Sequence, residues 1–175
     1  MVRSRIPFDI WFYFEGKDTR PDILDTMNEF PEFFRFAPHA HFVAFVVTIS
    51  ALFEKRTDTI NLPQLTKEMK SSQLLAASVS AEIDALLATA APIASKVAVL
   101  RNKAFAHRDA HITYADVFKM AAVTPDQLRD QTDVALKIAN RLLIAQGLSE
   151  QFFNPLPREH AGSMLETLKQ DTNRE

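Results

Sequence analysis

The chain has 175 residues, of which 47% are hydrophobic, a formal net charge of −2 and no cysteine. This length and apolar content suffice for one domain with a buried core, and the lack of cysteine excludes disulfides and thiolate metal sites. The nearly balanced charge argues against a general nucleic-acid coat protein. The three glycines form neither a GxxxxGK[ST] nor a GxGxxG motif, which excludes a glycine-rich phosphate loop.

The N-terminal third predicts helices that supply the bulky part of the core. The opening segment 6–14 is aromatic, which we interpret as core packing rather than an oligomer contact. The segment 22–36 has helical apolar spacing, and Pro31 should break or kink it. Pro38 stands where a helix can begin. We expect the apolar segment 39–55 to form a long helix that is nearly all buried.

The middle of the chain continues the helical pattern. Residues 62–69 fit a short helix with Pro63 in its first turn, and the alanine-rich segment 71–88 is periodic. Pro92 predicts the first turn of a further helix with apolar residues at four-three-four spacing. These residues are Ile93, Val97, Leu100 and Ala104.

The last long helix has clear start and stop signals. Thr124 can cap it, Pro125 suits its first position, and Gln127 completes a capping box. Gly147 is placed to end this helix as its C′ residue.

The C-terminal segment predicts less regular structure. We expect an extended arm at 152–157, a short helix at 161–168 and a flexible tail from about residue 169. No strand-like alternation persists along the chain. The predicted fold is therefore all-α, an antiparallel helical bundle that forms a single domain over residues 1–175.

One segment, residues 100–109, crowds cationic side chains, an amide and an imidazole together. Four Lys or Arg and no Asp or Glu lie between Lys96 and Arg108, so this stretch carries +4 and the remaining residues carry −6. A positive segment in an acidic protein indicates an anionic ligand, with phosphate the first candidate. His107 can also move protons near neutral pH.

The spacing alone does not make a site. On an ideal α-helix Arg101 and His107 lie about 120° apart, so they can meet over one pocket only if the helix loosens or a second copy supplies the partner. His107 could also be a structural histidine at a helix C-terminus, and Arg101 and Lys103 could be surface charges.

A family resemblance favours the functional reading. Residues 101–107, RNKAFAH, resemble the R-x(4–6)-H signature of the HEPN superfamily, including the polar residue Asn102 directly after the arginine. The longer stretch through Asp109 is similar to the abortive-infection U-like branch of bacterial HEPN proteins. The close match covers about ten residues, and a matching all-helical layout supports it.

The resemblance implies a helical bundle that dimerises so that two motif helices face one cleft. It also implies a metal-independent endoribonuclease without a cofactor. Catalytic roles would fall to His107 as general base or acid, to Arg101 on the non-bridging phosphate oxygens and to Asn102 as an orienting group. Lys103 and Arg108 would bind the RNA backbone.

Several alternatives stay open. HEPN toxins paired with nucleotidyltransferase antitoxins have a tyrosine two residues after the histidine, where this chain has Asp109, so that subfamily is not supported. The pairs His107/His111 and His39/His41 could bind metal, but neither has an obvious third ligand, so we expect no metal. A catalytically silent HEPN bundle that binds RNA or nucleotides, or acts as a scaffold, is the second functional hypothesis.

The expected setting is the cytoplasm. The most apolar run, residues 42–53, is about twelve residues long, whereas a membrane span needs roughly twenty, and residues 1–9 lack the apolar core of a signal peptide. We expect RNA and a second copy of the chain as partners, an antitoxin as a further one, and no membrane.

Overall fold

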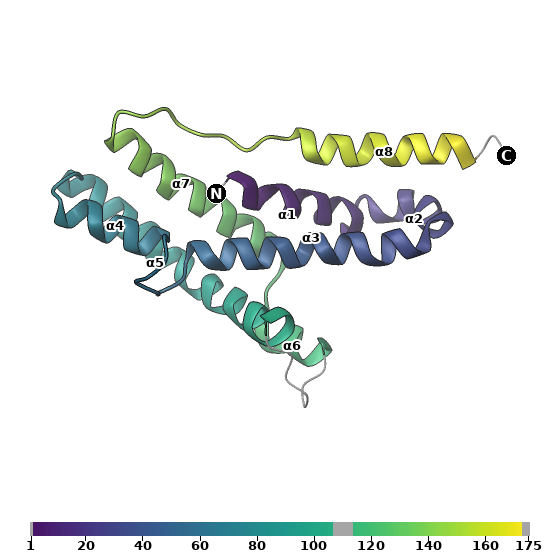
Figure 1. Cartoon of the computed structure of the whole chain (residues 1–175), viewed down its shortest axis with the longest axis horizontal. Helices are drawn as coiled ribbons and strands as arrows, with labels where there is room; N and C mark the ends of the chain where they lie inside the picture. The colour runs from purple at the N-terminus through teal and green to yellow at the C-terminus, as the bar shows by residue number, and fades with distance from the viewer. Residues whose placement is uncertain (1, 107–113, 173–175) are drawn as a thin grey trace. The chain divides into compact units, whose positions relative to one another are not determined.

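The computed structural model describes residues 2–106 and 114–172, and every regular element within these ranges is helical (Figure 1). This confirms the predicted fold class, an all-α helical bundle. The elements are α1 (Val2–Glu15), α2 (Arg20–Glu29), α3 (Pro31–Leu52), α4 (Leu62–Ser71), α5 (Ala77–Leu100), the π-helix η1 (Arg101–Ala106), α6 (Tyr114–Ala121), α7 (Pro125–Ala145) and α8 (Leu156–Thr172).

The described chain forms two compact units. One consists of residues 46–152, and the other joins residues 2–45 to the segment that begins at Phe153. Helix α3 contributes its first part to the second of these units and its last turns to the first. The expectation of a single domain over residues 1–175 stays a prediction.

The unit that contains α1, α2 and α8 has an aromatic core. Phe8 and Phe14 of α1 are 0% and 2% exposed, and the ring of Phe8 lies 5.1 Å from that of Phe45. The prediction of core packing for the aromatic opening segment is therefore confirmed. Further buried members of this core are Ile23, Met27, Phe34, Ala161 and Leu165.

The prolines in this unit behave in two ways. The predicted break at Pro31 is confirmed, because α2 ends at Glu29 and α3 begins at Pro31. The predicted start at Pro38 is wrong, because Pro38 lies inside α3. Phe34 before it and Phe42 after it are both buried, and we attribute the continuous helix to this packing, which offsets the hydrogen bond that proline cannot donate.

Helix α3 is also less buried than its composition predicts. Val47 is 42% exposed, while its neighbours Phe45, Val46 and Ile49 are at most 1% exposed. The helix therefore has one buried face rather than a buried circumference, and the expectation of nearly complete burial is wrong.

Helix α5 is the central element of the unit formed by residues 46–152. It packs against α4, α6 and α7, and α4 and α7 run antiparallel to it (Figure 1). Pro92 lies inside α5 rather than at the start of a new helix, so that prediction is wrong. Val97 and Leu100 of the predicted stripe are 1% and 0% exposed, as expected, whereas the side chain of Ala104 lies outside the described residues.

The predicted ends of α7 are confirmed. The Thr124 hydroxyl accepts a hydrogen bond from the Gln127 backbone N–H, and the Gln127 side chain accepts one from the Thr124 N–H, which completes the capping box. Gly147 has a φ of 70°, and the Leu148 N–H donates to the Leu143 carbonyl at 3.0 Å, as in a Schellman motif.

Helix α8 is longer than predicted at both ends. It begins at Leu156, within the expected extended arm, and continues through Thr172, past the residue where we expected a flexible tail. The side-chain Oδ1 of Asn154 accepts a hydrogen bond from the Leu156 backbone N–H at 3.1 Å. This side-chain contact satisfies an unpaired donor at the helix start, which makes the early start possible.

Two helical segments, α3 and residues 77–103, are long and apolar enough to cross a membrane by length and composition alone. Of their most apolar stretches, 39% and 22% are buried within the chain. Core helices of soluble proteins pass the same test, so this finding is weak evidence for a membrane span.

Candidate RNA-binding and catalytic site

The motif begins where α5 changes its winding. Residues Arg101–Ala106 form the π-helix η1, directly after the last α-helical residue Leu100. Hydrogen bonds from i to i+5 widen a helix, and short π segments occur frequently at functional sites. The expected angle of 120° between Arg101 and His107 assumed an ideal α-helix, whereas residues 101–106 form a π-helix. His107 and Arg108 themselves lie outside the described residues.

Arg101 forms an ion pair with a carboxylate that lies far from it in sequence. Its Nη1 donates a hydrogen bond to Oε1 of Glu54, in the connector between α3 and α4. The side chains are 32% and 13% exposed, respectively. The bond occupies one nitrogen of the guanidinium and leaves its other donors for a further anion.

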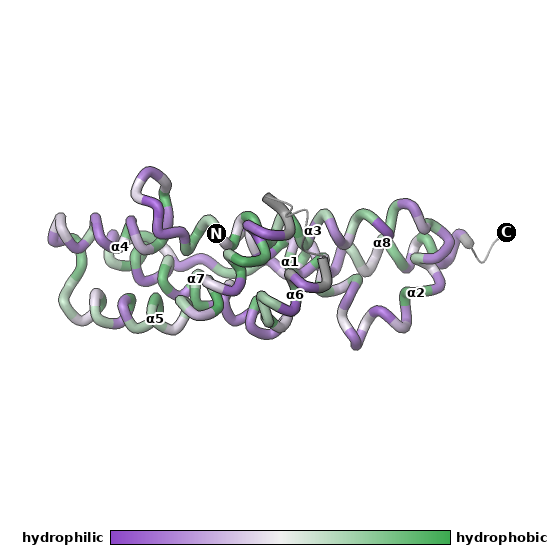
Figure 2. Tube along the Cα trace, turned by 90° about the horizontal axis from the view of Figure 1, so that it is seen from below, coloured by the Kyte–Doolittle hydropathy of each residue, from purple (hydrophilic) through white to green (hydrophobic). Residues whose placement is uncertain are grey.

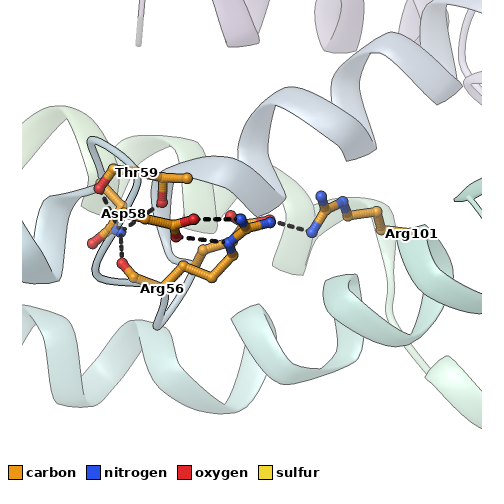
Figure 3. A network of polar contacts seen from close by, with 6 residues as sticks. Arg56, Asp58, Thr59 and Arg101 are labelled. Atoms are coloured by element: carbon orange, nitrogen blue, oxygen red, sulfur yellow. Dashed lines mark hydrogen bonds and ion pairs between the residues drawn. The ribbon is translucent and has the colours of Figure 1, made fainter.

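The connector itself carries a second cation. Arg56 donates to both carboxylate oxygens of Asp58, at 2.9 and 2.6 Å, and Figure 3 shows this pair beside the guanidinium of Arg101. The hydrogen bond from Arg56 lowers the pKa of Asp58. The same hydrogen bond, followed by the charges of Asp58 and Glu54, raises the pKa of Arg56. Glu54 therefore interacts electrostatically with both arginines.

An asparagine holds the connector in place. The Asn61 side-chain amide donates to the Arg56 carbonyl at 2.7 Å and to the Thr59 carbonyl at 3.2 Å. Its carbonyl oxygen caps α4 by accepting from the Gln64 N–H at 2.8 Å. Asn61 is 3% exposed, so these bonds are shielded from water and fix the loop that presents Glu54 and its neighbours. Figure 2 shows this connector as a hydrophilic stretch between α3 and α4.

A pocket of 650 Å³ opens beside Arg101. Three cations and one carboxylate line it at the connector and the motif, namely Lys55, Arg56, Arg101 and Glu54. Its remaining lining comes from Ser50, Phe53, Pro63, Leu87, Ala91, Ala94, Ser95, Ala98 and Asn102. A chain with a net charge of −2 thus has an excess of cations at this pocket, which suits an anionic ligand.

The structure brings two of the five predicted site residues to this pocket. Arg101 and Asn102 line it, and Asn102 is exposed. Lys103 is half-buried and is not among the lining residues. Lys96, which belongs to the cationic stretch of the sequence, instead donates to the Ala122 carbonyl at 2.7 Å, which is a structural contact.

Three residues of the pocket, Glu54, Lys55 and Arg56, are not predicted as site residues from the sequence. They lie more than 40 residues before the motif, Glu54 and Lys55 at the end of the predicted helix 39–55 and Arg56 directly after it. Their only sequence signal is the charge cluster Glu54-Lys55-Arg56 directly after an apolar helix, a pattern that ordinary surface loops share.

Metal ligation has little support in the part of the chain that the structure describes. No group of three or more His, Asp or Glu side chains that could hold an ion occurs there. His39 and His41 both lie in α3, and burial lowers the pKa of His41, which favours its neutral form. The other candidate pair, His107 and His111, falls outside the described residues.

The comparisons with known proteins agree with the motif. The family model HEPN AbiU2, described as AbiU2, matches residues 3–150. The comparisons with curated proteins and with solved structures find no match. The family match covers most of the chain, including α5 and the whole motif. The chain therefore belongs to the AbiU2 family of HEPN proteins.

Proposed function

We propose that this protein is a metal-independent endoribonuclease that acts in phage defence or as a toxin. The observation that carries the proposal is the position of Arg101 and Asn102, two residues of the R-x(4–6)-H motif, in a pocket that also contains Lys55 and Arg56. A cationic pocket at the family motif suits the phosphates of RNA.

The chemistry requires few groups from the protein, because RNA carries its own nucleophile. A general base removes the proton of the 2′-OH, which attacks the adjacent phosphorus and displaces the 5′ oxygen of the next nucleotide. We assign proton transfer to His107 and stabilisation of the negatively charged phosphorane to Arg101. The products would be a 2′,3′-cyclic phosphate and a 5′-OH.

In this scheme Glu54 positions Arg101 rather than reacting. Its bond to Nη1 orients the guanidinium while the remaining donors stay available to a phosphate. We also propose that two copies of the chain form one cleft in the cytoplasm, with a motif helix from each copy, because proton transfer from both sides of the phosphate needs a second acid-base group.

A silent RNA- or nucleotide-binding module is the second candidate function. The ion pair between Glu54 and Arg101 favours it, because a paired arginine has less charge to offer to a developing phosphorane. This alternative predicts RNA binding without turnover.

The deciding experiment measures cleavage of a labelled RNA by the purified protein, with and without EDTA, followed by analysis of the product ends. We expect cleavage that EDTA does not reduce and 2′,3′-cyclic phosphate ends. Cleavage that vanishes in EDTA and returns with Mg²⁺ or Mn²⁺ would exclude the metal-independent mechanism. RNA binding without any cleavage would favour the silent module.

A further inference from the structure

The pocket beside Arg101 has two chemically different ends. One face of α5 lines it with Leu87, Ala91, Ala94 and Ala98, at four-three-four spacing, and Phe53 and Pro63 complete the apolar lining. The same spacing continues three residues further to Arg101. An apolar helix face therefore leads directly to the cationic end of the pocket.

The cationic end has polar groups that are not engaged elsewhere in the described chain. Lys55 and Asn102 are both exposed, and neither makes an ion pair or a side-chain hydrogen bond to a described residue. Arg101 has donors left beyond its bond to Glu54. An anion at this end would gain contacts without breaking existing ones.

The alanines decide the shape of the other end. Because the methyl side chains of alanine project little from α5, a flat apolar group can lie directly against this face of the helix. The volume of 650 Å³ falls within the range of about 300–1,000 Å³ that small-molecule sites have. The pocket therefore suits a ligand that joins a flat, largely apolar ring to an anion, which is the chemistry of a nucleotide.

We infer that this pocket binds one nucleotide of an RNA chain, with its base against Ala91 and Ala94 and its phosphate at Lys55, Asn102 and Arg101. This inference rests on the proposed action on RNA, and it makes the pocket a site that holds the nucleotide next to the scissile phosphate. A free nucleotide has the same chemistry, and the test separates the two sources.

The test measures binding to 2′-O-methyl RNA, which lacks the nucleophilic hydroxyl and cannot be cleaved by this route. The first variant, Ala91→Leu/Ser95→Leu, fills the pocket from two exposed positions one turn apart. Leucine keeps a high helix propensity and offers no aromatic ring on which a base could stack. The matched control, Ala81→Leu/Ala85→Leu, adds the same side chains at the same spacing to exposed positions of α5 that do not line the pocket.

We expect the pocket-filling variant to bind 2′-O-methyl RNA about tenfold more weakly than the control variant, since the apolar surface of the base can no longer be buried in the pocket. Binding to an oligomer of abasic sugar-phosphate units should be equal for both. Lys55→Ala should weaken the binding of both oligomers, and the slope of log affinity against log salt concentration should fall by about 0.7. Lys137 is an exposed lysine of α7 outside the pocket, and Lys137→Ala should leave this slope nearly unchanged.

Equal RNA affinity of the filled and control variants would overturn the inference. The pocket would instead belong to a free nucleotide under two conditions. The wild-type protein would bind 5′-mononucleotides but not RNA, and the pocket-filling variant would no longer bind 5′-mononucleotides. Circular dichroism and thermal unfolding check that each variant is folded, and Ala91→Leu alone replaces the double variant if that one fails to fold.

The outcomes also distinguish this inference from the nuclease proposal. Wild-type protein that binds RNA through the pocket without cleaving it would exclude the nuclease and retain the nucleotide site. If the pocket-filling variant cleaves RNA and binds it as tightly as the wild type does, the nuclease proposal stands and the nucleotide site is excluded.

Discussion

The ion pair between Arg101 and Glu54 sets the charge and the orientation of the arginine in the pocket. It joins the first residue of the family motif to a connector 47 residues away, and it places a negative charge where RNA phosphates are proposed to bind. Glu54 should therefore affect RNA in two opposite ways. It lowers the positive charge of the pocket, and it orients the guanidinium.

Glu54→Gln tests both effects, because glutamine keeps the size and the acceptor oxygen but removes the charge. We expect tighter RNA binding with a steeper salt dependence, since one more cation becomes available to phosphate. We also expect cleavage to slow about tenfold, since Arg101 loses its orienting partner. Filter binding at several salt concentrations and single-turnover cleavage measure the two effects.

The control for this variant is Asp58→Asn, which removes a carboxylate from the same connector but not from Arg101. It should change turnover little. If Glu54→Gln matched the wild type in both affinity and turnover, the ion pair would have no functional role.

The roles of the motif residues can be separated by three substitutions. His107→Ala should reduce cleavage by about 10²–10⁴-fold with RNA affinity nearly intact, because proton transfer is lost. Arg101→Lys keeps the charge but loses the planar fork and should also reduce turnover more than binding. Lys103→Ala should instead weaken binding and flatten its salt dependence.

Thermal unfolding of the same variants is the control for structural effects. If His107 only supports the fold, His107→Ala would lower the melting temperature and any activity loss would follow stability. A folded His107→Ala protein that cuts RNA at the wild-type rate would exclude the enzyme and leave the binding module.

At the scale of elements, α5 determines the geometry of the site. It continues through Pro92, so a single helix connects the alanine face of the pocket with Arg101 at its end. Proline leaves the carbonyl one turn earlier without its helical donor and its ring crowds that carbonyl. Packing of the buried residues Ala90 and Val97 on either side offsets this cost.

Pro92→Ala should therefore stabilise the protein by about 1–3 kcal/mol, because it restores one helical hydrogen bond and removes the clash. Pro92 is exposed and does not line the pocket, so the loss of its ring leaves no cavity in the core. Urea unfolding measures the change. Ala85→Pro, at another exposed position of α5, is the converse control and should destabilise. A less stable Pro92→Ala protein would mean that α5 needs the proline for its packing.

At the scale of the whole molecule, the exposed surface of α5 bears on assembly. Only 22% of its most apolar stretch is buried within the chain. The remaining apolar surface is in contact with water, which is unfavourable. A second copy of the chain could cover it and would bring two motifs together, as the proposed mechanism requires.

We therefore predict a homodimer, with a mass of about 40 kDa by light scattering, twice the 19.8 kDa of one chain. The Ala81→Leu/Ala85→Leu variant should give the same mass, since its use as a control for RNA binding requires an intact dimer. A mass near 20 kDa over a wide concentration range would contradict the dimer and the shared cleft.

The all-α fold, the ends of α7 and the motif followed from the sequence by itself. Local chemistry explains these successes: the Thr124 capping box, the left-handed Gly147 and the break at Pro31 depend on residues a few positions apart. The R-x(4–6)-H stretch likewise identified the family that the match over residues 3–150 shows.

Only the tertiary structure decided which residues accompany the motif. Pro38 and Pro92 stay inside helices because buried neighbours pack on both sides of them, a non-local free energy that local propensity does not contain. Glu54, Lys55 and Arg56 reach Arg101 through the fold of the connector. Sequence separation carries no information on that approach, because the contact forms only when the connector between α3 and α4 has folded beside the end of α5.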